Sequence, residues 1–181
     1  MRNLSQNLYN LIFRYRKNKN FNKLKNDLGI NKTTLIQNDI IVSNPKKLTI
    51  EEYVYIGPRA VIQSIGEVLI KRGVIIGPDL RIYSANHKFR KAATLPYDKE
   101  YITGKVIIEE NVWIGGSVII LPGVIVGEGS IIGAGSVVSK SVPKMSIIAG
   151  NPAKIIGKRN ENEYNILKEK DAIYLKNKLK K

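Results

Sequence analysis

The chain contains a single histidine, His87, within the segment SANHKF (residues 84–89). An imidazole with its ordinary pKa of about 6.5 can take a proton from a hydroxyl or an amine at neutral pH. An isolated histidine is more often structural, but His87 stands where a regular repeat stops and a long irregular segment begins. Long loops on a rigid scaffold are usually functional, so we expect His87 to be a general base.

Neighbouring polar residues add few further catalytic groups. Asn86 could bind a substrate or simply occupy a corner of the fold, and Tyr83 and Asp79 are weaker candidates. The chain has no cysteine, which excludes a cysteine nucleophile, and one histidine cannot build a zinc site with three histidine ligands. The sequence patterns of serine hydrolases, P-loop proteins and dinucleotide-binding proteins are also missing. We expect no metal.

The elements that position these residues follow from a six-residue repeat. An aliphatic residue opens each unit and a small or β-branched residue takes its fifth position. The opening residues are Ile108, Ile114, Ile120, Val126, Ile132 and Val138, and the fifth-position residues are Val112, Val118, Val124, Ser130, Ser136 and Val142. Glycine is frequent at the second position (Gly115, Gly127 and Gly133), where we expect the turn to need positive φ.

A period of six fits neither a helix nor a plain amphipathic strand. It predicts short strands joined by tight turns, three per coil, with coils stacked at a strand spacing of roughly 4.8 Å. We therefore predict an all-β chain, a left-handed parallel β-helix of hexapeptide repeats with short terminal α-helical segments and one extruded loop.

The boundaries of this β-helix follow from the same pattern. Upstream, Ile50, Ile56 and Ile62 open three units and Ile70, Ile76 and Ile82 open three more, with a two-residue slip near Gly66 that predicts a bulged corner. Residues 88–104 lose the repeat and predict the extruded loop. We expect an N-terminal helical cap segment over 1–47, the β-helix domain over 48–153 and a basic helical tail over 154–181.

Both ends of the chain have amphipathic helical spacing. Residues 3–17 predict a helix that either caps the first coil or binds a membrane surface through its basic face. Residues 161–179 predict a helical segment that covers the exposed edge of the last coil. No apolar run is long enough to span a membrane and no signal-peptide cleavage site follows the N-terminus, so we expect a cytoplasmic protein or one at the inner face of the membrane.

The net charge of +15 arises from 30 Lys and Arg against 15 Asp and Glu. The electrostatic field of this charge favours binding of polyanions, namely nucleic acid, anionic lipid or a phosphorylated small molecule such as CoA. A surface whose charges are merely solvated explains the excess of basic residues equally well. The sequence lacks the platform of aromatic and basic residues that is typical of nucleic-acid binding, so we expect no nucleic-acid partner.

Residues 112–143 (VWIGGSVIILPGVIVGEGSIIGAGSVVSKSVP) and 149–159 (AGNPAKIIGKR) resemble the bacterial hexapeptide-repeat acetyltransferases. The similarity covers roughly residues 48–160 and is greatest to the maltose and galactoside acetyltransferases and to the O-acetyltransferases of capsule and O-antigen synthesis. The resemblance implies a homotrimer with acetyl-CoA bound between neighbouring subunits.

The resemblance also assigns roles to residues. It implies His87 as the catalytic histidine and Glu100 as an acidic residue near the site that could orient the imidazole or the acceptor. Its CoA-contacting positions fall on Trp113, Gly116, Ala134, Ser139, Lys140 and Lys154. Gly116 and Ala134 are small enough to let pantetheine approach the backbone, and the two lysines could meet its phosphates. Trp113 could instead be a packing residue.

We therefore expect transfer of an acetyl group from acetyl-CoA to a hydroxyl of a sugar, free or as a nucleotide-linked or lipid-linked acceptor, in surface polysaccharide biosynthesis. Because there is no cysteine and no nucleophile motif, we expect direct transfer rather than a covalent acyl-enzyme. Two alternatives stay open: acetylation of a xenobiotic such as an antibiotic, and a non-catalytic trimeric β-helix that serves as a scaffold.

Overall fold

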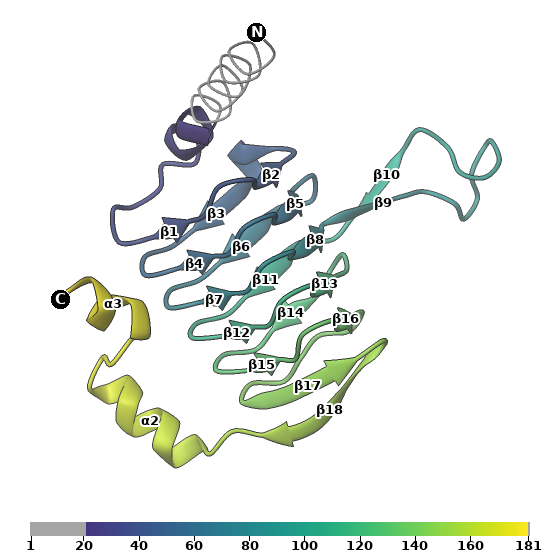
Figure 1. Cartoon of the computed structure of the whole chain (residues 1–181). Helices are drawn as coiled ribbons and strands as arrows, with labels where there is room; N and C mark the ends of the chain where they lie inside the picture. Colours follow the sequence, from purple (N-terminus) through teal and green to yellow (C-terminus); the bar gives the residue numbers. More distant parts are fainter. Residues whose placement is uncertain (1–20, 181) are drawn as a thin grey trace, which may run out of the picture.

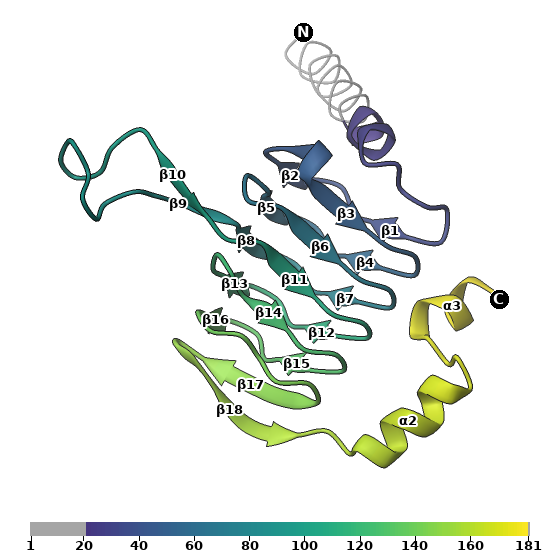
Figure 2. The same cartoon turned by 180° about the vertical axis from the view of Figure 1, so that it is seen from behind.

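The computed structural model describes residues 21–180, which form a triangular stack of coils (Figure 1 and, from behind, Figure 2). Each coil contributes one short strand to each of three parallel sheets. The first sheet contains β1 (Leu35–Ile36), β4 (Tyr55–Ile56), β7 (Ile75–Ile76), β12 (Trp113–Ile114), β15 (Ile131–Ile132) and β17 (Ser146–Gly150), and β18 (Ala153–Lys158) joins its end in antiparallel pairing. The second contains β2 (Ile41–Val42), β5 (Val61–Gln63), β8 (Arg81–Tyr83), β13 (Ile119–Ile120) and β16 (Val137–Val138). The third contains β3 (Leu48–Ile50), β6 (Val68–Ile70), β11 (Val106–Ile108) and β14 (Ile125–Val126), and η1 (Pro45–Lys47) precedes β3. The predicted β-helix is confirmed.

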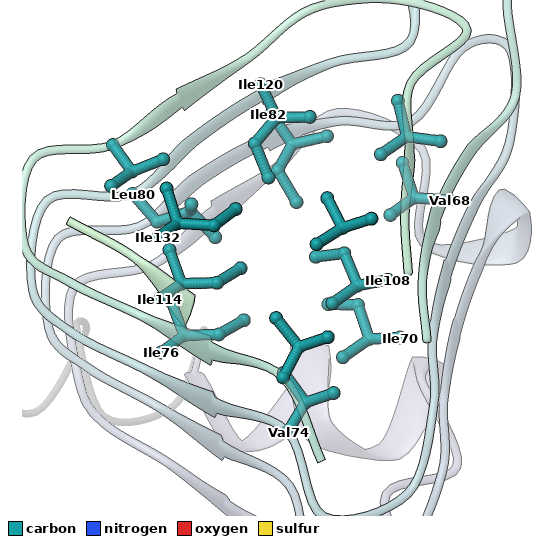
Figure 3. Packing of buried hydrophobic residues seen from close by; sticks show 14 of the residues in the cluster. Val68, Ile70, Val74, Ile76, Leu80, Ile82, Ile108, Ile114, Ile120 and Ile132 are labelled. Atoms are coloured by element: carbon teal, nitrogen blue, oxygen red, sulfur yellow. The ribbon is translucent and has the colours of Figure 1, made fainter. Parts of the chain in front are cut away.

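The predicted opening residues form the core. In Figure 3, aliphatic side chains stand one above another along the inside of each sheet. One such column joins Ile76, Ile114 and Ile132, which are in register as Cα partners and are at most 1% exposed. The fifth-position residues are buried as well, from Val118 at 0% to Val142 at 6% exposed. A period of six therefore buries the same positions in every coil, and the apolar area removed from water stabilises the stack.

The expected reason for glycine at the second position is wrong. Gly115, Gly127 and Gly133 do not have positive φ; positive φ falls on the fourth position of the unit, as at Ser117 (φ 58°) and Gly135 (φ 72°). The second position instead needs glycine for close approach between coils. A Cβ on Gly115 would lie 2.6 Å from the backbone nitrogen of Ala134, and one on Gly127 would lie 2.5 Å from that of Lys144.

The two-residue slip and the extruded loop fall at the same corner, between the second and third sheets. The slip near Gly66 joins β5 to β6, and one coil later the loop leaves after β8. Its base is a β-hairpin in which β9 (Ala85–His87) pairs antiparallel with β10 (Tyr101–Thr103), and it projects from the stack in Figures 1 and 2. The last residues of the predicted loop are therefore a strand.

The β-helix extends beyond the predicted boundaries at both ends. The first two strands of the first coil, β1 and β2, precede residue 48, and β18 extends past residue 153. Residues 21–27 are helical, and Phe21, Leu28 and Ile30 pack against the core at the first coil. The helix predicted over residues 3–17 lies outside the described residues. None of the helices between residues 21 and 180 is both long and apolar enough to cross a membrane.

The C-terminal segment forms two helices, α2 (Glu161–Glu169) and α3 (Tyr174–Leu179). They do not cover the last edge of the β-helix as expected, because β18 pairs there with β17. Instead they run back along the corner between the third and first sheets, on the side of the stack away from the hairpin (Figures 1 and 2). Tyr164 of α2 accepts a hydrogen bond from Asn111 (3.0 Å), and Asp171 before α3 pairs with Arg72 (2.8 Å).

Candidate active site

His87 is the last residue of β9 and its imidazole lies between two tyrosine rings of the hairpin. The ring of Tyr97 stacks on it with centroids 3.9 Å apart and an interplanar angle of 17°. The ring of Tyr101 lies at 4.6 Å and is tilted by 32°. Nδ1 of His87 is buried and has no hydrogen-bond partner within residues 21–180. Backbone pairing and aromatic contacts therefore hold this imidazole without a hydrogen bond to Nδ1.

The base of the hairpin is fixed by close packing on the preceding coil. The hydroxyl of Ser84 donates to the carbonyl of Gln63 (2.7 Å) and accepts from the backbone N–H of Gly66 (2.8 Å). A Cβ on Gly66 would lie 2.1 Å from the carbonyl oxygen of Ser84, so only glycine lets the hairpin leave the stack here. The irregular corner predicted at Gly66 is thus the support on which the candidate site rests.

The three other predicted substrate-binding residues lie around this base. Asn86 is exposed, and its side-chain oxygen accepts the backbone N–H of His87 (2.9 Å). Tyr83 ends β8, one step before the hairpin. Glu100 is exposed and accepts a hydrogen bond from Lys88 Nζ (2.7 Å), which with the nearby Asp98 raises the pKa of Lys88. Glu100 is therefore hydrogen-bonded to Lys88 and not to Nδ1 of His87.

Asp79, the weaker candidate, lies at another corner, between the first and second sheets. Its carboxylate receives two hydrogen bonds of 2.7 Å from Arg59, and these bonds lower its pKa. Asp79 also has positive φ (61°) at the fourth position of its unit. This acidic residue is therefore part of an ion pair between successive coils, away from the imidazole.

Three of the expected CoA contacts lie along the corner between the first and second sheets. The carbonyl of Gly116 accepts the N–H of Gly135 (2.8 Å), next to Ala134 in the following coil. Lys154 of β18 pairs with Ala149, whose Cβ lies 3.0 Å from the position of a Cβ on Gly133. Gly116, Ala134 and Lys154 therefore follow one another down this corner.

The remaining expected CoA contacts lie elsewhere. Ser139 and Lys140 are exposed after β16, at the corner from which the hairpin leaves, two coils further along. Trp113 is on the outer face of the first sheet and 55% exposed, at the edge of a groove of about 290 Å³ beside the C-terminal helices. In Figures 1 and 2, β12 and β9 lie on opposite sides of the stack, so one chain does not bring Trp113 to His87.

Sequence reasoning missed Tyr97 and Tyr101, the two residues that contact the imidazole. Residues 88–104 have no repeat from which a contact could be read, and Tyr97 reaches His87 only through the turn of the hairpin. The concentration of aromatic residues in an otherwise polar loop was the available signal. Between residues 21 and 180, no three His, Cys, Asp or Glu side chains are grouped so that they could hold a metal ion.

Known proteins share both the repeat and the fold. Residues 105–140 match the family model described as bacterial transferase hexapeptide (six repeats). The galactoside O-acetyltransferase of Lactococcus lactis is 38% identical over 102 residues, which cover 54% of this chain and 46% of that protein. WcaF of Escherichia coli, whose name assigns it to colanic acid biosynthesis, is 28% identical over 74% of this chain and 71% of its own.

The β-helix also matches a solved hexapeptide-repeat acetyltransferase from Vibrio cholerae in complex with acetyl coenzyme A. The TM-score is 0.70 at 28% identity, covering 79% of this chain and 78% of the other. The chain spans little more than half the length of several curated relatives that it matches, between 50% and 59%. Residues 105–140 thus carry the hexapeptide repeat of bacterial transferases, and the β-helix has the fold of a hexapeptide-repeat acetyltransferase.

Proposed function

We propose that the protein transfers an acetyl group from acetyl-CoA to a hydroxyl of a sugar, with His87 as general base. The observation that carries the proposal is the placement of the only histidine at the base of the hairpin, beside a β-helix that matches acetyltransferase structures. The imidazole lies in a site that two tyrosine rings and the Ser84–Gly66 contact hold in place.

The proposed reaction is a direct transfer. As the acceptor oxygen attacks the thioester carbonyl, its proton passes to His87, and the tetrahedral intermediate then collapses with release of the CoA thiolate. The thiolate takes the proton from the imidazolium, which restores the neutral base. A backbone N–H would stabilise the developing oxyanion. A base of this kind contributes on the order of 10²–10⁴ in rate.

We further propose that the working unit is a homotrimer. The strand that ends at His87 (β9) and the strand that begins at Trp113 (β12) lie on opposite sides of one chain, so a site that uses both must take them from two subunits. In this arrangement acetyl-CoA runs along the corner of Gly116, Ala134 and Lys154, near Ser139 and Lys140 of the adjoining corner. Asn86, Tyr83 and Glu100 would then face the acceptor.

A sugar hydroxyl is the acceptor we favour because the names of relatives refer to galactoside O-acetylation and to colanic acid biosynthesis. The role in surface polysaccharide synthesis follows as a proposal, with the protein in the cytoplasm or at the inner face of the membrane. A panel of sugars, nucleotide sugars and antibiotics, assayed for thiol release from acetyl-CoA, separates this proposal from xenobiotic acetylation. Failure to bind acetyl-CoA in calorimetry would favour the scaffold alternative.

The His87→Ala variant tests the base. We expect turnover to fall by roughly 10² or more, because the acceptor loses its proton acceptor. The oligomeric state and the circular dichroism spectrum should match those of the wild type, since His87 is not a core residue. Near-normal turnover in this variant would overturn the assignment of His87.

A further inference from the structure

The contact between His87 and Tyr101 follows from the register of the hairpin. The backbone N–H of Lys88 donates to the carbonyl of Glu100 (3.0 Å), so Lys88 and Glu100 are a hydrogen-bonded pair. In antiparallel strands such pairs alternate with non-hydrogen-bonded pairs, whose side chains lie closer together. His87 and Tyr101, the next pair along, are of this second kind, which brings their rings to 4.6 Å.

Tyr97 reaches the other side of the imidazole through the turn of the loop. Its carbonyl accepts a hydrogen bond from the Thr94 hydroxyl (2.8 Å), and the N–H of Asp98 donates to the carbonyl of Lys88 (3.1 Å). These two bonds fold the chain back over β9 and place the Tyr97 ring parallel to the imidazole at 3.9 Å. Tyr97 is nevertheless 44% exposed, so core packing does not explain its position.

A catalytic histidine is commonly oriented by a hydrogen bond that its second ring nitrogen donates to a carboxylate or a carbonyl. His87 lacks such a bond, because Nδ1 is buried with no partner among the described residues, and the nearby carboxylate of Glu100 is bound to Lys88. We propose that Tyr97 and Tyr101 form an aromatic clamp that orients the His87 imidazole in place of that hydrogen bond. The inference rests on the proposed function and makes both tyrosines positioning residues.

The clamp also has an electrostatic consequence. The faces of aromatic rings carry partial negative charge and attract cations placed over them. When His87 takes the acceptor's proton, the imidazolium forms against the face of Tyr97. The clamp therefore holds the ring for proton transfer and favours the charge that the transfer creates. Both effects require the ring of Tyr97 and not its hydroxyl.

Nuclear magnetic resonance tests the clamp without relying on activity. Because the full chain has one histidine, protein labelled with ¹³C and ¹⁵N in histidine gives a single set of imidazole signals. In the wild type we expect the ring-carbon protons of His87 to be displaced upfield from those of free histidine by the ring currents of the two tyrosines. Tyr97→Ala and Tyr101→Ala should each move them back toward the free position, whereas Tyr97→Phe should keep them displaced.

Kinetics tests the positioning role. Tyr97→Ala should lower kcat by roughly tenfold to a hundredfold, the range expected when a catalytic group is misplaced, with KM for acetyl-CoA close to that of the wild type. Tyr97→Phe should restore kcat. Phe89→Ala is the matched control, because Phe89 is an exposed aromatic residue of the same loop whose ring contact is with Arg90.

The outcomes separate the clamp from the proposed function. Imidazole signals at the free positions in the wild type, or unmoved in both alanine variants, overturn the clamp whatever the activity. Signals that move while kcat of Tyr97→Ala stays unchanged overturn its positioning role. A His87→Ala variant with normal turnover overturns the proposed base, and it does so without altering the spectroscopic result.

Discussion

At the corner between the first and second sheets, the adjacent residues Gly115 and Gly116 have different amounts of space. A Cβ on Gly115 would lie 2.6 Å from the nitrogen and 2.9 Å from the Cα of Ala134, and backbone atoms cannot move aside as a flexible side chain can. A Cβ on Gly116 would lie no closer than 3.4 Å to Pro78, which is ordinary contact. Stacking of the coils therefore requires glycine at residue 115. At residue 116 the stacking leaves room for a Cβ, so it does not explain the glycine there.

This difference predicts that the same substitution destabilises the protein at one site and is nearly neutral at its neighbour. Gly115→Ala should lower the free energy of unfolding by roughly 1–3 kcal/mol, as overpacking does. Gly116→Ala should change it by no more than about 0.5 kcal/mol. Urea unfolding followed by circular dichroism measures both. If Gly116 lines the pantetheine site as proposed, its alanine variant should bind acetyl-CoA more weakly in calorimetry. An equal loss of stability in the two variants would contradict the assignment.

At the scale of the elements, ion pairs and hydrogen bonds join α2 and α3 to the β-helix, alongside the buried side chains of Tyr164, Ile173 and Leu175. Arg72 bonds Glu52 and Asp171, and its guanidinium lies over the ring of Tyr53. Hydrogen bonds from Lys176 and Arg72 lower the pKa of Asp171. Burial raises the pKa of Glu128, but its bonds to Lys168 and Tyr164 outweigh this and leave the pKa below its ordinary value.

Acid should therefore weaken the attachment of the C-terminal helices. Both carboxylates have a lower pKa in the folded protein than in the unfolded chain, so their stabilising contribution is complete above the ordinary values of about 4 and is lost as pH falls through the lowered ones. Trp113, the only tryptophan, lies in the groove beside these helices and reports their release by fluorescence. We expect its emission to change below about pH 4, while the β-sheet signal in circular dichroism persists.

At neutral pH, Arg72→Ala should produce part of the same fluorescence change, because Asp171 loses one of its two bonded cations. Arg59→Ala is the matched control. It breaks a comparable pair with Asp79 at a corner that does not carry the helices. The same change in both variants would mean that Trp113 responds to the β-helix rather than to α2 and α3.

For the whole molecule, the main consequence of the fold is that it separates residues that the reaction is proposed to combine. The hairpin with His87 and the first sheet with Trp113 lie on opposite sides of the stack in Figures 1 and 2. In a ring of three subunits with head-to-tail contacts, each interface would join one such side to the other. A trimer would then have a mass three times the 20.3 kDa of the chain, with three shared sites.

Subunit mixing tests this arrangement. His87→Ala chains and Trp113→Ala chains should each be weakly active at low acetyl-CoA concentration. The first variant lacks the base, and the second lacks a side chain that lines the proposed acetyl-CoA site. In mixed trimers from equal amounts of both, roughly a quarter of the sites should combine an intact His87 with an intact Trp113. Activity should recover to about that fraction of the wild type. No recovery, in mixed trimers confirmed by mass, would mean that the two residues do not share a site between chains.

The six-residue repeat was sufficient to predict the β-helix and the point at which the coils are interrupted beside His87. This was possible because each coil repeats the same local environment, so burial appears in the sequence as a period.

Only the tertiary structure revealed that Tyr97 and Tyr101 enclose His87, that Gly115 is needed for close approach, and that Asp171 pairs with Arg72. The tyrosine contacts and the Arg72–Asp171 pair join segments whose distance along the chain bears no relation to the period; the Arg72–Asp171 pair spans 99 residues. Gly115 meets Ala134 of the next coil, but the closeness of that approach does not follow from the repeat. These contacts depend on how a hairpin turns, how closely two coils stack and where a tail lies. The single histidine could thus be identified as the candidate base from the sequence, whereas the residues that orient its ring followed from the folding of the loop.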